Sequence, residues 1–215
     1  MKLIEKNLAE VIKDVSSSSP APGGGSVSAI LGALGAALAE MVCKLTAGKK
    51  KFEAVKDEME KNINILYRLR DELQNLIDLD ADAFSDVVTA YKLPKETDEE
   101  KSNRALAISH ATEKAIRVPL KTMELSLNVL ELLPFIAQNG HPSSVSDVGV
   151  ACIAAFGAIK GAFLNVWINS LDLMGLDHKE KAEEFLKTGK DIIQQAEEKY
   201  KTTMSLVEAK LTPSQ

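Results

Sequence analysis

Cysteine, histidine and aromatic residues are scarce in this chain. It has 2 cysteines, 3 histidines and 1 tryptophan in 215 residues, and aromatic residues make up 5% of the composition. Cys43 and Cys152 stand in apolar segments without a CxxC spacing, which predicts two buried, reduced thiols and no disulfide framework. His110, His141 and His178 show no HExxH or Cys/His grouping, so we expect no metal site.

An excess of basic charge and a long apolar run are also missing. The net charge of −5 argues against nucleic-acid binding, and the lysines at 49–51 form only a local patch. The most apolar windows, 27–39 and 148–159, end at Glu40 and Lys160 and are too short to span a bilayer. We expect them to be core helices of a protein that does not enter the membrane. Because the N-terminus lacks a signal-peptide pattern, the expected location is the cytoplasm.

Helical periodicity runs along nearly the whole sequence. Apolar residues recur at spacings of three and four within 3–15, 26–47, 52–93, 97–133, 145–174 and 177–210. Thr97 with Glu100, and Asp177 with Glu180, have the spacing of helix-capping pairs, while Pro119 predicts a kink. No segment of convincing length alternates like a strand. We therefore predict an all-α fold, a single-domain bundle over residues 1–215 of roughly five to seven mostly long helices.

Three breaks in this helical pattern are candidate functional positions. The first is the acidic block LIDLDADAF, where steps of three and four from Leu73 through Ile77 place Asp80 on or beside the apolar face. Asp78 and Asp82 flank it. A carboxylate there must be paired, hydrogen-bonded or functional, and repulsion among three acids raises the pKa of one of them. The alternative is a solvated acidic edge.

The second break is one face of the segment 145–174. Spacings of three and four place only small, amide or carboxylate side chains on that face: Asp147, Ala151, Ala154, Ala158, Ala162, Asn165, Asn169 and Asp172. Such a face either lines a pocket for a flat polar molecule or makes a close helix–helix contact with buried amides. The pattern favours neither.

The third break is the stretch PAPGGGS, in which Gly23, Gly24 and Gly25 precede Ser26 at an expected helix start. Free backbone N–H groups and the positive end of the helix dipole suit an anion or a carbonyl group. The stretch has neither the GxGxxG nor the GKS/T pattern. A linker or a plain N-cap is therefore the competing interpretation.

Four blocks in order, SSPAPGGGSVSA, LIDLDADAF, AYKLPKETDEEKSNR and SDVGVACIAAFGAIKGAFLNVWINSLD, resemble the cyclodeaminase/cyclohydrolase family. This family is the all-helical C-terminal half of formiminotransferase-cyclodeaminase, and it also occurs as stand-alone bacterial proteins. The resemblance runs from the first helix to Leu173. It implies a homodimer that acts on a tetrahydrofolate derivative, polyglutamylated or not, and that needs no metal or redox cofactor.

The resemblance implies conversion of 5-formiminotetrahydrofolate to 5,10-methenyltetrahydrofolate and ammonia, a step of histidine degradation, with an essential aspartate in the acidic block. We assign that role to Asp80, with Asp78 as the nearest rival. A carboxylate with a raised pKa takes the N10 proton and then protonates the leaving amine. The substrate-binding residues that we expect are Gly23, Gly24, Gly25, Ser26, Asp82, Asp147, Asn165, Asn169, and, for the glutamate tail, Lys49 and Lys95.

The nearest alternative is a methenyltetrahydrofolate cyclohydrolase, which hydrolyses the same one-carbon bridge, since stand-alone members of the family include that activity. Two non-catalytic alternatives stay open. A structural helical dimer predicts no folate binding, and a catalytically inactive folate carrier predicts binding without turnover.

Overall fold

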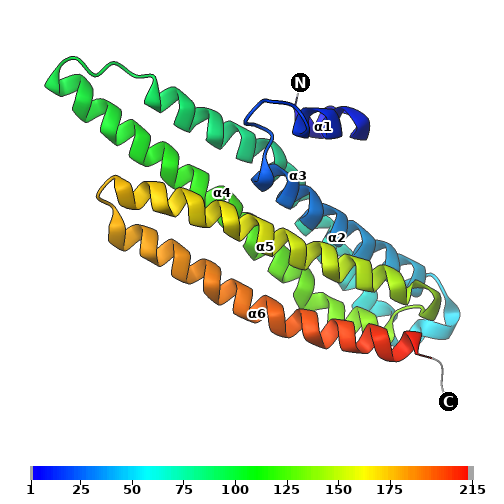
Figure 1. The fold of residues 1–215 in the computed structure, drawn as a ribbon. Helices are drawn as coiled ribbons and strands as arrows, with labels where there is room; N and C mark the ends of the chain where they lie inside the picture. Colours follow the sequence, from blue (N-terminus) through cyan, green and yellow to red (C-terminus); the bar gives the residue numbers. More distant parts are fainter. Residues whose placement is uncertain (1, 213–215) are drawn as a thin grey trace.

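The computed structural model describes residues 2–212, which contain six α-helices, three short 3₁₀ helices and no strand (Figure 1). The all-α prediction is therefore confirmed. In chain order the elements are η1 (Leu3–Glu5), α1 (Leu8–Val15), α2 (Gly24–Ala47), η2 (Lys50–Val55), α3 (Lys56–Tyr91), α4 (Asp98–Asn139), η3 (Pro142–Ser144), α5 (Val145–Gly175) and α6 (Lys179–Leu211).

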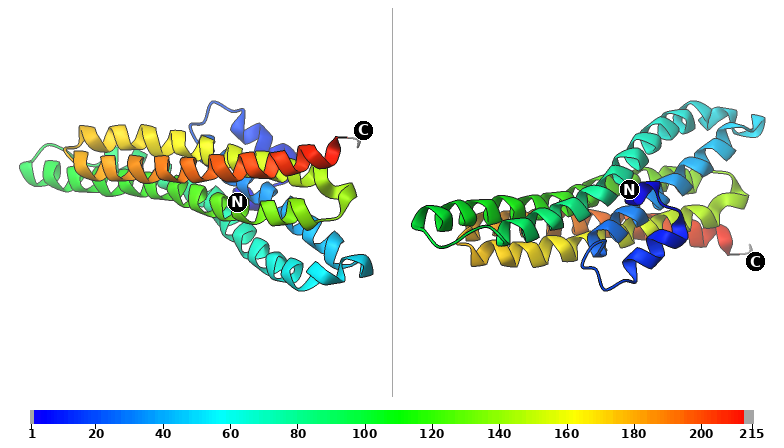
Figure 2. Two further views of the ribbon diagram at one scale, coloured as in Figure 1. Left: turned by 90° about the horizontal axis from the view of Figure 1, so that it is seen from below. Right: turned by 90° about the horizontal axis from the view of Figure 1, so that it is seen from above.

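Helices α2 to α6 form an elongated bundle, and α1 lies outside it, beside the N-terminal part of α2 and the middle of α3 (Figures 1 and 2). The α3–α4 hairpin extends beyond the other helices at one end of the bundle. At the opposite end, the C-terminal part of α2 and the first turns of α3 lean away from α4 to α6 (Figure 2). The main core contains buried side chains from each of α2 to α6.

Small residues allow α2 to approach its neighbours closely. A Cβ atom at Gly32 would lie 2.7 Å from Ser126 Oγ of α4, and one at Gly35 would lie 3.0 Å from the carbonyl oxygen of Ala151 on α5. Both contacts are tighter than ordinary packing, so a side chain at either position would have to displace its neighbour. The small-residue pattern of α2 therefore makes contacts within the chain.

The predicted helix over 3–15 is divided into η1 and α1 by extended backbone at Lys6 and Asn7, and other helix ends also differ from the predictions. The capping pair Thr97 and Glu100 is confirmed, since Thr97 Oγ1 accepts the Glu100 N–H at 3.1 Å. The predicted cap at Asp177 is wrong: Asp177 has a φ of 65°, and α6 begins after His178 without a side-chain cap. A residue in the left-handed region closes the preceding helix and does not start the next one. Helix α4 also continues through Pro134 to Asn139, past the predicted end.

Two helices are longer than the apolar windows that were predicted to be too short to span a bilayer. The segments Gly24–Ala47 and Pro142–Gly175 are long and apolar enough to cross a bilayer, because the full helices exceed the short windows used for the sequence prediction. However, 61% and 50% of their most apolar stretches are buried inside the bundle. Such burial is typical of the core helices of a soluble protein.

Candidate active site

A cavity of about 320 Å³ lies where the first turn of α2 meets α3, α4 and α5. Its polar lining comes from the backbone at 23–25 and from four side chains, those of Asp80, Asn165, Asn169 and Asp172. Phe84, Val87 and Ile168 supply apolar lining. The fold thus joins residues of all three breaks in the helical pattern at one site.

Asp80 is held against the first turn of α2. Its Oδ2 lies 3.0 Å from Ser26 Oγ, and the backbone N–H of Ser26 also donates to the carboxylate. A Cβ atom at Gly25 would overlap the carboxylate of Asp80, so only glycine leaves room for it. Because Gly25 is in the first turn of α2, the carboxylate lies at the positive end of that helix dipole.

Burial raises the pKa of Asp80, and the two hydrogen bonds from Ser26 oppose this effect without cancelling it. A carboxyl group with a raised pKa exchanges a proton more readily near neutral pH than an ordinary aspartate does. Asp80 is therefore the acid–base candidate of this cavity.

The two asparagines of α5 use their amide nitrogens within the protein. Asn165 Nδ2 donates to the Gly161 carbonyl at 3.0 Å, and Asn169 Nδ2 donates to the Ala115 carbonyl of α4 at 2.8 Å. Pro119 has no N–H, so it leaves the carbonyl of Ala115, four residues earlier, without its helical donor. Asn169 supplies that donor. Each Nδ2 keeps a second N–H, so each amide can offer a ligand its Oδ1 as an acceptor and one N–H as a donor.

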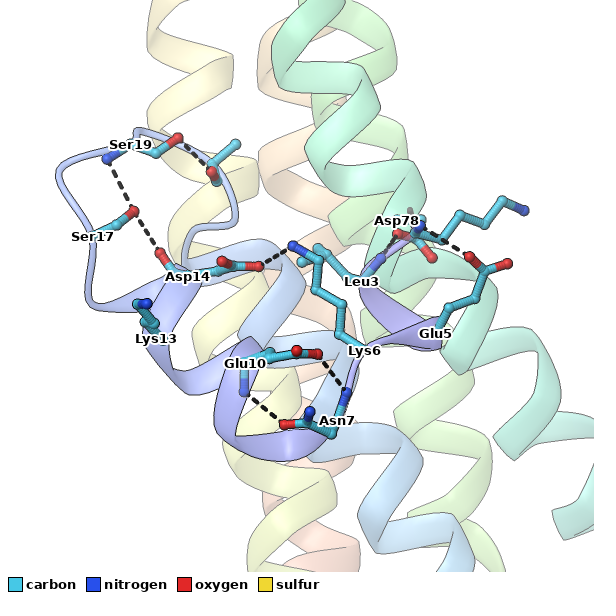
Figure 3. Close-up of polar contacts among 12 residues, drawn as sticks. Leu3, Glu5, Lys6, Asn7, Glu10, Lys13, Asp14, Ser17, Ser19 and Asp78 are labelled. Atoms are coloured by element: carbon cyan, nitrogen blue, oxygen red, sulfur yellow. Dashed lines mark hydrogen bonds and ion pairs between the residues drawn. The ribbon is translucent and has the colours of Figure 1, made fainter.

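The other two acids of the block face a different cavity. Asp78 and Asp82 line a space of about 650 Å³ between α3 and the N-terminal segment, together with Lys6 and Asp14. Asp78 Oδ1 accepts the backbone N–H of Leu3 at 2.6 Å, and Lys6 pairs with Asp14 (Figure 3). This cavity is larger, but no residue of the polar face of α5 lines it, and Asp80, whose pKa is raised by burial, lines the other cavity. We therefore favour the cavity of Asp80 as the active site.

Three other predicted binding residues lie away from Asp80 within one chain. Asp147 is in the first turn of α5, 18 residues before Asn165, which corresponds to a rise of about 27 Å. Lys49 lies beyond the far end of α2, a helix about 36 Å long. Lys95 is exposed in the loop after α3, and α3 alone rises about 17 Å from Asp80 to its end at Tyr91. None of the three lines the cavity.

Two kinds of lining residue were not among the predicted site residues. Asp172 shares the polar face of α5, three residues after Asn169, so its position in that pattern was a usable signal. Phe84 and Ile168 read as ordinary apolar residues, and their exposure of 39% and 56% is visible only in the structure. Among residues 2–212, no three His, Cys, Asp or Glu side chains gather as a metal site would require.

A sequence model described as formiminotransferase-cyclodeaminase matches residues 7–188. The chain belongs to the formiminotransferase-cyclodeaminase family. A relative from Methylorubrum extorquens, named methenyltetrahydrofolate cyclohydrolase, is 41% identical over 197 residues, covering 90% of this chain and 93% of that protein. The formimidoyltransferase-cyclodeaminase of Rattus norvegicus is 38% identical over 179 residues, which are 83% of this chain but 33% of the rat protein.

A solved structure supports the same assignment. The crystal structure of formiminotetrahydrofolate cyclodeaminase from Thermotoga maritima superimposes with a TM-score of 0.82 at 27% identity, covering 97% of this chain and 98% of the other. The family prediction is confirmed, and the chain is an enzyme of the formiminotransferase-cyclodeaminase family. The names of its relatives divide between cyclodeaminase and cyclohydrolase.

Proposed function

We propose that this enzyme is a formiminotetrahydrofolate cyclodeaminase in which Asp80 is the acid–base group. The observation that carries the proposal is the setting of Asp80: a carboxylate with a raised pKa, held by Ser26, in a cavity lined by side-chain oxygens. The names of the relatives supply the substrate class.

The reaction needs one group that first accepts and then donates a proton. N10 of the folate adds to the carbon of the protonated formimino group, and the N10 proton passes to the Asp80 carboxylate. Asp80 then protonates the amine, the bond between that carbon and the amine breaks, and ammonia leaves. The product is the 5,10-methenyl cation. A carboxylate beside the reacting carbon stabilises this positive charge as it develops.

The cavity suits a ligand that is rich in hydrogen-bond donors. Asn165 and Asn169 offer acceptor oxygens, and the carboxylate of Asp172 lines the same cavity. The pterin ring of a folate has an amino group and a ring N–H on one edge. We propose that this edge faces Asn169 and Asp172, which leaves N5 and N10 toward Asp80.

No lysine or arginine among the described residues lines this cavity. We therefore propose that the glutamate tail of the folate extends out of the cavity. The predicted contacts of Lys49 and Lys95 with a polyglutamate tail stay predictions, as do a cytoplasmic location, a role in histidine degradation and independence from metals and cofactors.

A methenyltetrahydrofolate cyclohydrolase is the second candidate, because the relative named for that activity matches nearly full length at 41% identity. In that reaction Asp80 would activate water for attack on the methenyl carbon. The experiment follows methenyltetrahydrofolate absorbance after adding the enzyme to 5-formiminotetrahydrofolate, with ammonia assayed in parallel. A rising band with ammonia supports the cyclodeaminase. Decay of added methenyltetrahydrofolate, without turnover of the formimino compound, supports the cyclohydrolase.

We also propose that the enzyme is a homodimer. Helix α5 exposes a row of large apolar side chains, namely Val150, Ile153, Leu164, Trp167, Ile168 and Leu171. Exposed apolar patches of this kind mark interaction surfaces. Light scattering of the purified enzyme tests the proposal, and Leu164→Glu should shift a dimer toward the monomer.

A further inference from the structure

The hydroxyl group of Ser26 lies between two acceptors on α3. Its Oγ is 3.0 Å from the carbonyl oxygen of Ile77 and 3.0 Å from Oδ2 of Asp80. Ser26 is completely buried. Because a hydroxyl has one proton, it donates to only one of these two oxygens at a time.

We propose that Ser26 is a positioning residue whose hydroxyl proton follows the protonation state of Asp80. When Asp80 is ionised, the Ser26 O–H donates to Oδ2. When Asp80 is protonated, its carboxyl O–H donates to Ser26 Oγ, and the Ser26 O–H turns to the carbonyl of Ile77. One rotation of a hydroxyl thus keeps every polar atom paired in both states.

This arrangement matters because a buried polar group without a partner is costly. Asp80 in the proposed reaction must be ionised at one step and protonated at the next. The backbone N–H of Ser26 is a fixed donor that favours the ionised form of Asp80, whereas the Ser26 hydroxyl donates to that form and accepts from the protonated one. The role of Ser26 in turnover rests on the proposed function of Asp80, but the hydrogen-bond exchange does not.

The other groups around Asp80 do not supply an equivalent switch. The loop before α2 and the first turn of α2 contribute only uncharged residues to the cavity of Asp80. Helix α4 contributes Ala115, which is also uncharged. Asp78 and Asp82 of its own helix line the other cavity. Asp172 of α5 is the other titratable side chain that lines the cavity within the described residues, and it is exposed.

The first test uses the parent protein without any substitution. The ¹³Cγ shift of Asp80 reports its protonation, and the ¹³C′ shift of Ile77 reports hydrogen bonding to that carbonyl. We expect both signals to titrate with the same midpoint, because the Ser26 hydroxyl reaches Ile77 only when Asp80 is protonated. An Ile77 carbonyl signal that stays constant through the Asp80 titration would overturn the proposal.

The second test uses matched serine variants of α2. Ser26→Ala removes the hydroxyl donor to ionised Asp80 and keeps the backbone N–H, so the Asp80 midpoint should rise by about one to two pH units. The midpoint of the acidic limb in a plot of kcat/KM against pH should move to higher pH by the same amount. Ser28→Ala is the control, since Ser28 is also buried but its Oγ donates to the carbonyl of Gly24, at 2.7 Å. Ser26→Thr keeps the hydroxyl and should restore the parent midpoint.

The outcomes separate this proposal from the proposed function. Equal shifts in Ser26→Ala and Ser28→Ala, or no shift in either, contradict the role of Ser26. If neither folate substrate is turned over, the proposed function fails, while the two NMR titrations still decide whether the Ser26 hydroxyl exchanges partners.

Discussion

Gly25 and Asp80 are fitted to each other: the carboxylate of Asp80 occupies the space that a side chain at position 25 would need. The pair joins the first turn of α2 to the middle of α3, 55 residues apart in the sequence. The glycine run therefore forms the start of α2 and lines the candidate site, and it does not act as a linker.

Replacing Gly25 with alanine should displace the Asp80 carboxylate. Because a displacement of about 1 Å at a reacting group can lower turnover about 100-fold, we expect a loss of that order in kcat. Gly157→Ala is the control, since the nearest atom to a Cβ there is 3.9 Å away. It should keep activity and gain about 0.5–1 kcal/mol of stability. Steady-state kinetics and thermal unfolding measure both effects, and a fully active Gly25→Ala enzyme would contradict the fit.

Asp80→Asn should abolish most turnover and increase stability at neutral pH. Losing an acid–base group lowers kcat by about 10²- to 10⁴-fold. Burial raises the pKa of Asp80, so the folded protein holds this proton at pH values where the unfolded chain has released it. The free energy of unfolding therefore falls as pH rises from the ordinary aspartate pKa through the raised value. Asparagine has no such charge.

Urea titrations at several pH values check this effect. The variant should exceed the parent in stability above the raised pKa of Asp80 and match it well below the ordinary aspartate pKa. Asp71→Asn, at an exposed position of the same helix, should change neither stability nor turnover appreciably. A variant that is less stable than the parent at neutral pH would show that the Asp80 charge is stabilising.

Asp78→Ala should loosen the N-terminal segment, because alanine leaves the Leu3 N–H without its acceptor. Asp78 Oδ1 accepts the Leu3 N–H, and α1 has no buried residue, so this bond is one of few that hold the segment on α3. We expect faster hydrogen exchange across 3–15 and a smaller loss of kcat than in Asp80→Asn. A loss of kcat as large as that of Asp80→Asn, with unchanged exchange, would transfer the catalytic role to Asp78.

Arg70→Ala should destabilise the fold without involving the cavity. Glu40 has only 4% of its side chain exposed and pairs with Arg70 at 2.7 Å and with Lys44 at 2.6 Å. Removing one partner of a buried ion pair costs about 3–5 kcal/mol when the other charge is left unpaired, and we expect a cost below that range because Lys44 still pairs with Glu40 and Arg70 is partly exposed. Lys61→Ala breaks the exposed pair with Glu58 and should cost less than about 1 kcal/mol. Chemical denaturation compares the two, and equal losses would contradict this difference.

The periodic apolar pattern predicted the long helices well, because burying one face of each helix is what holds such a bundle together. The prediction of a helix cap at Asp177 was wrong, because the left-handed backbone conformation of Asp177 depends on how α5 and α6 are connected in space. Pro119 indicated a disturbed helix, but its consequence, a free carbonyl at Ala115 that is bonded by Asn169, requires the packing of α5 on α4.

At the candidate site, the acidic block also combines a role that the sequence predicted with a contact that only the structure shows. The helical spacing placed Asp80 beside the apolar face, and the family resemblance selected it for catalysis. Neither the spacing nor the resemblance could predict that Asp78 accepts the backbone N–H of Leu3, because that hydrogen bond joins residues 75 positions apart. Likewise, the polar face of α5 combined Asp147 with Asn165, although a straight helix separates them by about 27 Å.

The sequence by itself determined the helices, the family and the residue types available for acid–base chemistry, since these depend on local periodicity and short motifs. Only the tertiary structure decided which of these residues meet. It brought Gly25, Ser26 and Asp80 together with two amides of α5 and turned Asp78 and Asp82 to another cavity. The physical reason is that packing between distant helices decides both the contacts of a carboxylate and its exposure to water, and the exposure to water in turn sets its pKa.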